Sequence, residues 1–259
     1  MAPIVVSELA VSAVKGTRLL SRSELVLGLD GVRENRRFYV IDERGRMLNG
    51  KQLGELPAIV ADYDDDARRL ALRFPDGRVV DGDVELGAAV QTSFFSTEIA
   101  AQLLHGPFSQ ALSDLAGRPL RLVEAPDAGG AVDRGRRGAV SLVSCAALAQ
   151  RAGVAGVQRG DSRRFRMLVV IDGTGAHAED EWVGGRARIG GALVAFHGHV
   201  GRCLVTGRDP EDGRPNLPTL ELLASYRAAL TSTEPLPFGV WGEVLEAGRI
   251  SIGDAVTPG

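Results

Sequence analysis

Residues 70–80 read Leu-Ala-Leu-Arg-Phe-Pro-Asp-Gly-Arg-Val-Val. Two short extended runs, 70–74 and 78–80, flank the turn Pro75-Asp76-Gly77. Proline presets one turn dihedral and glycine supplies the left-handed one, so this stretch is a strong β-hairpin signal. Short apolar runs separated by turns continue through the first half of the chain. This spacing predicts short strands that curl into a barrel-like sheet.

Similar extended runs, alternating with a few helical patterns, fill the rest of the chain. Strands are expected at 4–14, 25–27, 38–41, 47–48, 58–61, 120–123, 140–143, 167–171, 186–189, 192–197, 240–245 and 250–256. Apolar residues at helical spacing predict helices at 96–104, 108–115, 145–151 and 218–230. We therefore predict an α+β fold that is β-rich and has few helices. The Gly-, Asp- and Arg-rich segment 127–138 is the expected domain boundary or mobile loop.

The composition is that of an ordinary globular protein. The chain has 259 residues, 44% of them hydrophobic, and a net charge of −3, which gives no reason to expect nucleic-acid binding. No apolar run approaches the ~20 residues of a membrane span, and the N-terminus lacks the pattern of a signal peptide. We expect a cytoplasmic protein without nucleic-acid or membrane partners. Two cysteines are too few for a disulfide scaffold or a four-thiolate iron–sulfur cluster.

The basic residues carry a second signal. Only Lys15 and Lys51 among the 30 basic residues are lysines. A general bias toward arginine explains most of this, but the compact charge of lysine suits a phosphate. Basic clusters at 36–37 and 163–166 precede expected strands, and Lys15 follows another. Each cluster alone is compatible with a solvated face, whereas together they predict convergence on one anion.

Cys203 is the most reactive candidate side chain. Arg202 and Arg208 lie close in sequence, and cations favour the thiolate, which attacks electrophiles and binds metals. The alternative is a small buried core residue, the usual fate of a free cysteine. Cys145, behind the expected helix cap Ser144, fits that alternative better.

Six segments in this order resemble motifs of the MOSC proteins, named for the C-terminal domain of molybdenum-cofactor sulfurase. They are Ala13-Val14-Lys15-Gly16, Asn35-Arg36-Arg37-Phe38, Ser141-Leu142-Val143-Ser144, Phe165-Arg166-Met167-Leu168, His177-Ala178-Glu179-Asp180-Glu181-Trp182, and Gly201-Arg202-Cys203 with Thr206 and Asp209-Pro210. The resemblance is to two-part members of the group of the mitochondrial amidoxime-reducing component. It implies an N-terminal MOSC β-barrel-like domain at 1–125 and a MOSC domain at 126–259.

The resemblance also implies chemistry. Cys203 would be the catalytic residue and the protein ligand of molybdenum. The molybdenum cofactor, a molybdopterin, would be bound by Lys15, Arg36, Ser144, Arg166 and Thr206. The protein would be an oxidoreductase that reduces N-hydroxylated small molecules, such as amidoximes, hydroxylamines and N-oxides. A separate electron-transfer protein, of the ferredoxin, flavodoxin or cytochrome type, would supply the electrons.

One departure from the family pattern bears on the cofactor. Leu168 stands where the family has asparagine, and an apolar side chain cannot supply the amide's hydrogen bonds. Losing one such contact costs on the order of 1–3 kcal/mol. Two alternative functions therefore stay open. One is a metal-free sulfur carrier, sulfurtransferase or nucleophilic enzyme that uses Cys203, and the other is a non-catalytic ligand-binding module.

Overall fold

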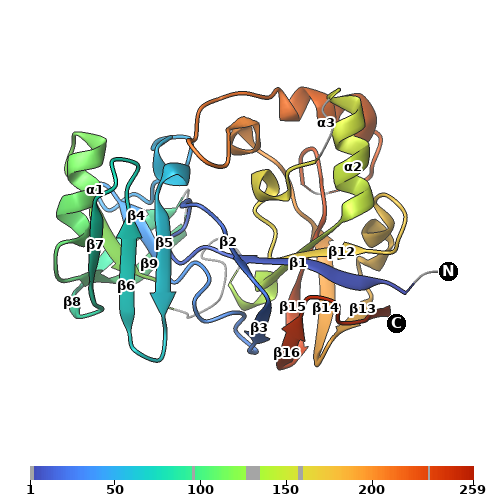
Figure 1. Ribbon diagram of the computed structural model, residues 1–259, viewed down its shortest axis with the longest axis horizontal. Helices are drawn as coiled ribbons and strands as arrows, with labels where there is room; N and C mark the ends of the chain where they lie inside the picture. The colour runs from blue at the N-terminus through green and yellow to red at the C-terminus, as the bar shows by residue number, and fades with distance from the viewer. Residues whose placement is uncertain (1–2, 95–96, 127–134, 157–159, 233) are drawn as a thin grey trace.

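The computed structural model describes residues 3–94, 97–126, 135–156, 160–232 and 234–259. Strands dominate it, and the predicted β-rich α+β fold is confirmed (Figure 1). Three α-helices are present among the described residues: α1 (Phe108–Ala116), α2 (Cys145–Val154) and α3 (Thr219–Arg227). Most of the expected boundary segment, residues 127–134, lies outside the described residues. No helix among the described residues has the length and apolar character needed to cross a membrane.

The larger sheet has eight strands and forms the body of the second half. Its order is β17-β13-β14-β15-β11-β12-β1-β2. The bounds are β1 (Val5–Val11), β2 (Leu20–Arg22), β11 (Val140–Ser144), β12 (Val169–Asp172), β13 (Arg186–Ile189), β14 (Ala192–His199), β15 (Val240–Glu246) and β17 (Val256–Pro258). A bridge between Val5 in β1 and Ala255, just before β17, joins strands near the opposite ends of this order, so the sheet curls on itself. Apolar residues of these strands fill the interior of the curled sheet as one core cluster.

The first strand of the chain lies in the sheet of the second half. β1 pairs antiparallel with β12, Val5 opposite Asp172 and Leu9 opposite Val169. Figure 1 shows β1 crossing from the middle of the molecule beneath α2, with both termini on the same side. β3 (Glu24–Leu27) likewise pairs with β16 (Gly248–Ser251) near the end of the chain. The division at residue 125 stays a prediction, and these pairings interlock the two parts.

Two smaller sheets build the rest of the first half. One has the order β4-β10-β9-β8 and the other β5-β6-β7. Their bounds are β4 (Phe38–Ile41), β5 (Val60–Asp64), β6 (Arg69–Arg73), β7 (Val79–Asp83), β8 (Leu86–Phe94), β9 (Thr97–Leu104) and β10 (Arg121–Glu124). The hairpin predicted at 70–80 is confirmed as β6 and β7, with Gly77 in left-handed backbone at φ +86°. A second core cluster fills this half.

The helix predicted at 96–104 is wrong in the described part of that range. Residues 97–104 form β9, which pairs with β8 along almost its full length and with β10 on its other edge. The spacing of Ile99, Leu103 and Leu104 suits a helix as well as a strand. Pairing on both edges satisfies the backbone of β9, and such tertiary context overrides local propensity.

Candidate functional site

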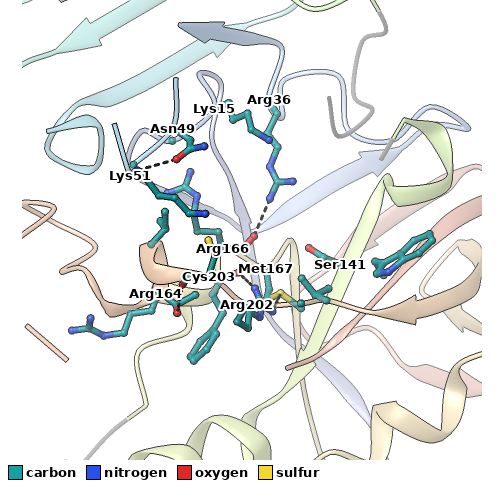
Figure 2. A pocket seen from close by; sticks show the side chains of 18 of the residues that line it. Lys15, Arg36, Asn49, Lys51, Ser141, Arg164, Arg166, Met167, Arg202 and Cys203 are labelled. Atoms are coloured by element: carbon teal, nitrogen blue, oxygen red, sulfur yellow. Dashed lines mark hydrogen bonds between the residues drawn. The ribbon is translucent and has the colours of Figure 1, made fainter. Parts of the chain in front are cut away.

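A cavity of about 320 Å³ lies between the two halves of the molecule (Figure 2). The first half contributes the segment after β1, the start of the strand at β4 and the turn at 49–51. The second half contributes the approach to β12 and the cysteine turn after β14. Of the residues predicted to form the site, Lys15, Arg36, Arg166, Cys203 and Thr206 all line this cavity. The structure thus brings together five of the six side chains that the sequence singled out.

The cavity lining is strongly basic. Six of its side chains are cations, namely Lys15, Arg36, Lys51, Arg164, Arg166 and Arg202, and no Asp or Glu is found among the described residues that line it. Both lysines of the chain are in this set. Fixed cations from separate segments, unopposed by carboxylates in the lining, make a site for a multiply charged anion.

Arg36 and Arg166 both have strained backbone, and a hydrogen bond joins them. Both have left-handed φ values, +54° and +53°, which non-glycine residues seldom adopt. Arg36 donates from its guanidinium to the carbonyl oxygen of Arg166 at 3.2 Å, and Arg166 donates to that of Thr17 at 2.7 Å. Burial, and then the nearby charge of Arg36, lower the pKa of Arg166 to about 9. Backbone strain combined with like charges at short range is typical of a preorganised binding site.

Arg202 anchors the cysteine turn, which begins at Cys203. Its buried guanidinium donates to the carbonyl oxygens of Phe238 at 3.0 Å and Phe165 at 2.8 Å, and to the sulfur of Met167 at 2.9 Å. It also lies over the Phe165 ring, 5.2 Å from the centroid. The sequence predicted that Arg202 would act on the thiol, whereas these contacts give its guanidinium a structural role in anchoring the turn.

Cys203 begins a short 3-10 turn that presents its thiol to the cavity. The side chain is exposed, so the expectation of a buried core residue does not hold for it. The Cys203 carbonyl oxygen accepts two bonds from Thr206, from the amide at 3.0 Å and from the hydroxyl at 2.9 Å. Thr219 at the start of α3 donates in turn to the Thr206 carbonyl oxygen at 2.9 Å. Thr206, predicted to bind cofactor, therefore uses its hydroxyl to fix the backbone of Cys203.

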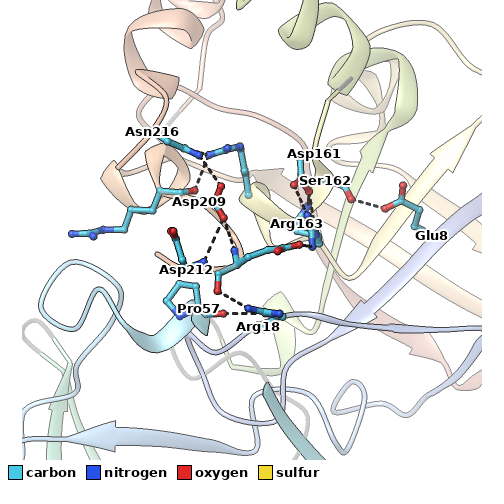
Figure 3. Close-up of polar contacts among 12 residues, drawn as sticks. Glu8, Arg18, Pro57, Asp161, Ser162, Arg163, Asp209, Asp212 and Asn216 are labelled. Carbon is cyan, nitrogen blue, oxygen red and sulfur yellow. Dashed lines mark hydrogen bonds and ion pairs between the residues drawn. The ribbon is translucent and has the colours of Figure 1, made fainter. Parts of the chain in front are cut away.

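The acidic segment Asp209-Pro210-Glu211-Asp212-Gly213, after Cys203, connects the two halves (Figure 3). Arg18 of the first half donates to the Glu211 carbonyl oxygen at 2.6 Å and to that of Pro57 at 3.3 Å. Arg163 pairs with the carboxylates of Glu211 and Asp161, both at 2.9 Å. The hydrogen bond to Asp161 is the main cause that raises the pKa of Arg163. These bonds fix the cysteine segment relative to the basic strand ends across the cavity.

Ser144 is not brought to the cavity. Its hydroxyl is fully buried and accepts from the Ala147 amide at 3.2 Å as the N-cap of α2. Its own amide donates to the Glu179 carboxylate at 3.1 Å. Ser141, three residues earlier on β11, lines the cavity instead. Residues an odd number apart point to opposite faces of a strand, so the alternation along 140–144 was the signal that favours Ser141.

Leu168 does not line the cavity either. Its side chain is 3% exposed and belongs to the core cluster of the large sheet, while the preceding Met167 faces the cavity. Its amide donates to the Ser141 hydroxyl at 3.1 Å. The sequence analysis expected Leu168 to leave a gap in the cofactor contacts. The side chain that faces the cavity is instead that of the preceding residue, Met167.

The remaining wall residues carried no local sequence signal. Asn49 and Gly50 form a turn, and the rings of Phe94 and Trp241 add flat surfaces. The Lys15 ammonium lies over the Phe94 ring, 5.2 Å from its centroid. Within the part of the chain that the structure describes, no group of three or more His, Cys, Asp and Glu side chains is arranged to hold a metal ion. A metal here would depend on the thiol of Cys203 together with ligands that the anion itself carries.

Two family models match the chain and agree with this two-part architecture. Residues 4–118 match the MOSC N-terminal beta barrel domain and residues 130–257 match the MOSC domain. No curated protein matches the chain in sequence. The solved structure of the YuaD protein from Bacillus subtilis is 13% identical, with a TM-score of 0.48, over 99% of this chain and 96% of its own. That of YiiM from Geobacillus stearothermophilus is 13% identical, with a TM-score of 0.37, over 68% of this chain and 73% of its own. Because the two domain matches together span nearly the whole sequence, the chain belongs to the MOSC-domain proteins that carry an N-terminal MOSC beta barrel domain.

Proposed function

We propose that this protein is a molybdenum-cofactor-dependent oxidoreductase that reduces N-hydroxylated compounds with electrons from a separate protein. The observation that carries the proposal is the exposed thiol of Cys203 on the wall of a cavity lined by six cations. Family membership supports a cofactor of this kind, and the cavity chemistry supports its charge. Amidoximes, hydroxylamines and N-oxides are the substrate classes that we propose.

The donor set fits such a cofactor. A pterin dithiolene phosphate is an anion, and guanidinium forks with lysine ammonium groups are the side chains that bind phosphate most strongly. A thiolate is a suitable ligand for a metal that prefers soft donors. When bound, the cofactor would supply a metal centre that takes up an oxygen atom from the substrate by cycling between two oxidation states. Cys203 would be the protein ligand, and Lys15, Arg36 and Arg166 would bind the phosphate end.

The protein residues around this centre would orient the substrate and the thiol. Thr206 and Arg202 keep the cysteine turn in place through carbonyl oxygens. The rings of Phe94 and Trp241 give the cavity flat apolar surfaces. A substrate with a planar N-hydroxylated group would pack against such a surface, with its reactive end toward the thiol. We propose an electron carrier of the ferredoxin, flavodoxin or cytochrome type as the partner. We also propose that the protein works in the cytoplasm.

Elemental analysis with a matched cysteine control tests the proposal. The protein is purified from a host that makes molybdenum cofactor, as the wild type, Cys203→Ala and Cys145→Ala. Molybdenum per chain is measured together with reduction of a small amidoxime by a chemical electron donor. We expect near-stoichiometric metal and turnover in the wild type and Cys145→Ala, and loss of turnover with reduced metal in Cys203→Ala. Cys145 is a fair control because it lies at the start of α2, outside the cavity lining.

Metal-free wild-type protein would contradict the proposal. The chemistry of the Cys203 thiol would then discriminate between a sulfur-transfer protein and a non-catalytic binding module. A persulfide at Cys203, detected by mass spectrometry after exposure to a sulfur donor, would support a sulfur carrier or sulfurtransferase. The exposure of the Cys203 thiol is the observation that favours this alternative. A metal-free protein whose thiol reacts no faster than a free cysteine would instead indicate a non-catalytic binding module.

A further inference from the structure

A second cavity, of about 260 Å³, adjoins the first. The two cavities share Asn49 and Phe94 in their linings, so these residues form the wall between them. Figure 2 shows Asn49 and Lys51 together on one side of the first cavity. The turn that carries them continues to Gln52, which lines the second cavity. A ligand longer than the first cavity would have to cross this wall to reach the second.

The second cavity has an excess of positive charge. Its charged lining residues are Asp42, Arg46 and Arg118. Asp42 is matched by Arg46, whose Nε lies 2.9 Å from its carboxylate. The carboxylate also accepts from the backbone amides of Arg44 and Arg46. One positive charge is therefore left over, and it is that of Arg118.

Arg118 is held in place without being neutralised. Its guanidinium donates to the backbone carbonyl oxygen of Gln52 at 3.2 Å, which ties it to the wall between the cavities. Among the described residues no carboxylate lies within ion-pair distance of it. A guanidinium with one neutral acceptor keeps most of its donors available for a ligand, and its planar fork matches a carboxylate.

We propose that the second cavity binds an anionic group at the far end of the substrate. The substrate class would be N-hydroxylated compounds with a flat, aromatic middle and a carboxylate opposite the N-hydroxyl group. The reactive end would lie near Cys203, the middle would contact Phe94, and the carboxylate would pair with Arg118. This inference rests on the proposed function for the reactive end, whereas the charge preference rests on the second cavity alone.

The preference for an anion over a cation follows from the charge of the second cavity. Arg118 leaves that cavity with a net positive charge, because Asp42 is paired with Arg46. An amine or a second amidinium group at the far end would be repelled there. A partly exposed pair between Arg118 and a carboxylate corresponds to about a fivefold gain in affinity, because such pairs contribute up to ~1 kcal/mol.

Two substrates that differ only at the far end test the inference. They are benzamidoxime and its para-carboxylate, with wild type, Arg118→Gln and the control Arg73→Gln on the exposed side of β6. We expect the wild type to favour the carboxylate about fivefold in kcat/KM. The preference should fall to near one in Arg118→Gln and persist in Arg73→Gln. It should also shrink at 0.5 M salt, since screening weakens an exposed pair.

Calorimetric titration separates a failure here from a failure of the proposed function. The same two compounds are titrated into each variant, which reports binding even if the protein turns over neither. Tighter binding of the carboxylate that depends on Arg118 would support the second cavity without any redox activity. Equal binding of both compounds, an equal loss for both in Arg118→Gln, or no binding of either would overturn the inference.

Discussion

Replacing Arg202 by methionine should destabilise the second half of the protein and displace the cysteine turn. Methionine keeps much of the length of the side chain but removes every donor. The guanidinium is the hydrogen-bond donor to the buried carbonyl oxygens of Phe165 and Phe238, on two segments that flank the turn. Both buried acceptors would lose that donor.

The magnitude follows from these two acceptors. A buried group left without its partner costs about 1–3 kcal/mol, so two cost about 2–6 kcal/mol. Removing the guanidinium also removes the desolvation penalty of a buried charge, which returns part of that cost. We therefore expect a loss of about 3 kcal/mol in the free energy of unfolding. Arg202→Lys should lie between the wild type and Arg202→Met, because one ammonium can donate to one of the two carbonyls but not bridge both.

Urea unfolding followed by tryptophan fluorescence measures this effect. The two tryptophans, Trp182 and Trp241, both lie in the second half, so their emission reports on that part. With a denaturant slope of about 2 kcal/mol per molar, a loss of 3 kcal/mol lowers the midpoint by about 1.5 M. Arg186→Met, an exposed arginine on β13, is the control and should shift the midpoint by less than about 0.3 M. A midpoint for Arg202→Met as close to the wild type as that of the control would refute the anchoring role.

Three further substitutions test residues that the sequence singled out. Ser144→Ala should lower the free energy of unfolding by about 1 kcal/mol in thermal unfolding, as expected for a lost helix N-cap, and leave the molybdenum content unchanged. A fall in molybdenum content at unchanged stability would indicate instead that Ser144 contacts the cofactor. Leu168→Asn should cost about 2–3 kcal/mol by burying an unpaired amide in the core, without any gain in metal, and a rise in metal content would contradict the structure. Arg166→Gln tests the pH dependence of anion binding, measured by titration with pyrophosphate. With a pKa of about 9, Arg166 is charged at pH 7.5 and largely neutral at pH 10. Its contribution to the affinity of the wild type should therefore disappear between these pH values, and the variant should lack it at both. The same residue should make folding more favourable as pH rises above 9, because Arg166 in the unfolded chain keeps its higher, ordinary pKa and then binds more protons than in the folded protein. A flat dependence would argue that Arg166 is not desolvated.

The hairpins were predictable because their signals are local. Pro75-Asp76-Gly77 specifies its own backbone geometry, and the strands on either side need only a short turn to pair. β8 and β9 had no such signal, since neither Phe95 nor Ser96, the two residues between them in sequence, is a proline or glycine. The alanines of 97–104 also suit a helix better than a strand, and only pairing with β8 and β10 decides the outcome.

The site was predictable to the extent that its residues carry charge or sulfur. Lys15 and Cys203 are rare residue types in this chain, Arg36 and Arg166 belong to basic clusters before expected strands, and all four line one cavity. Sequence motifs do not say which of two nearby residues faces that cavity. The choice between Met167 and Leu168 depends on strand facing, and a shift of one residue exchanges the core for the cavity.

The position of β1 in the large sheet has a consequence for how the chain folds. β1 is made before its partner β12, and more than half of the 259 residues lie between the two strands. The bridge from Val5 to Ala255 joins residues that are still further apart. Contacts this distant in sequence make folding slow, because loop closure precedes any stabilising contact. β2 can cover one edge of β1 early, but the edge that pairs with β12 stays open until β12 is made. We therefore expect the newly made first half to expose an open strand edge, which makes its folding dependent on chaperones.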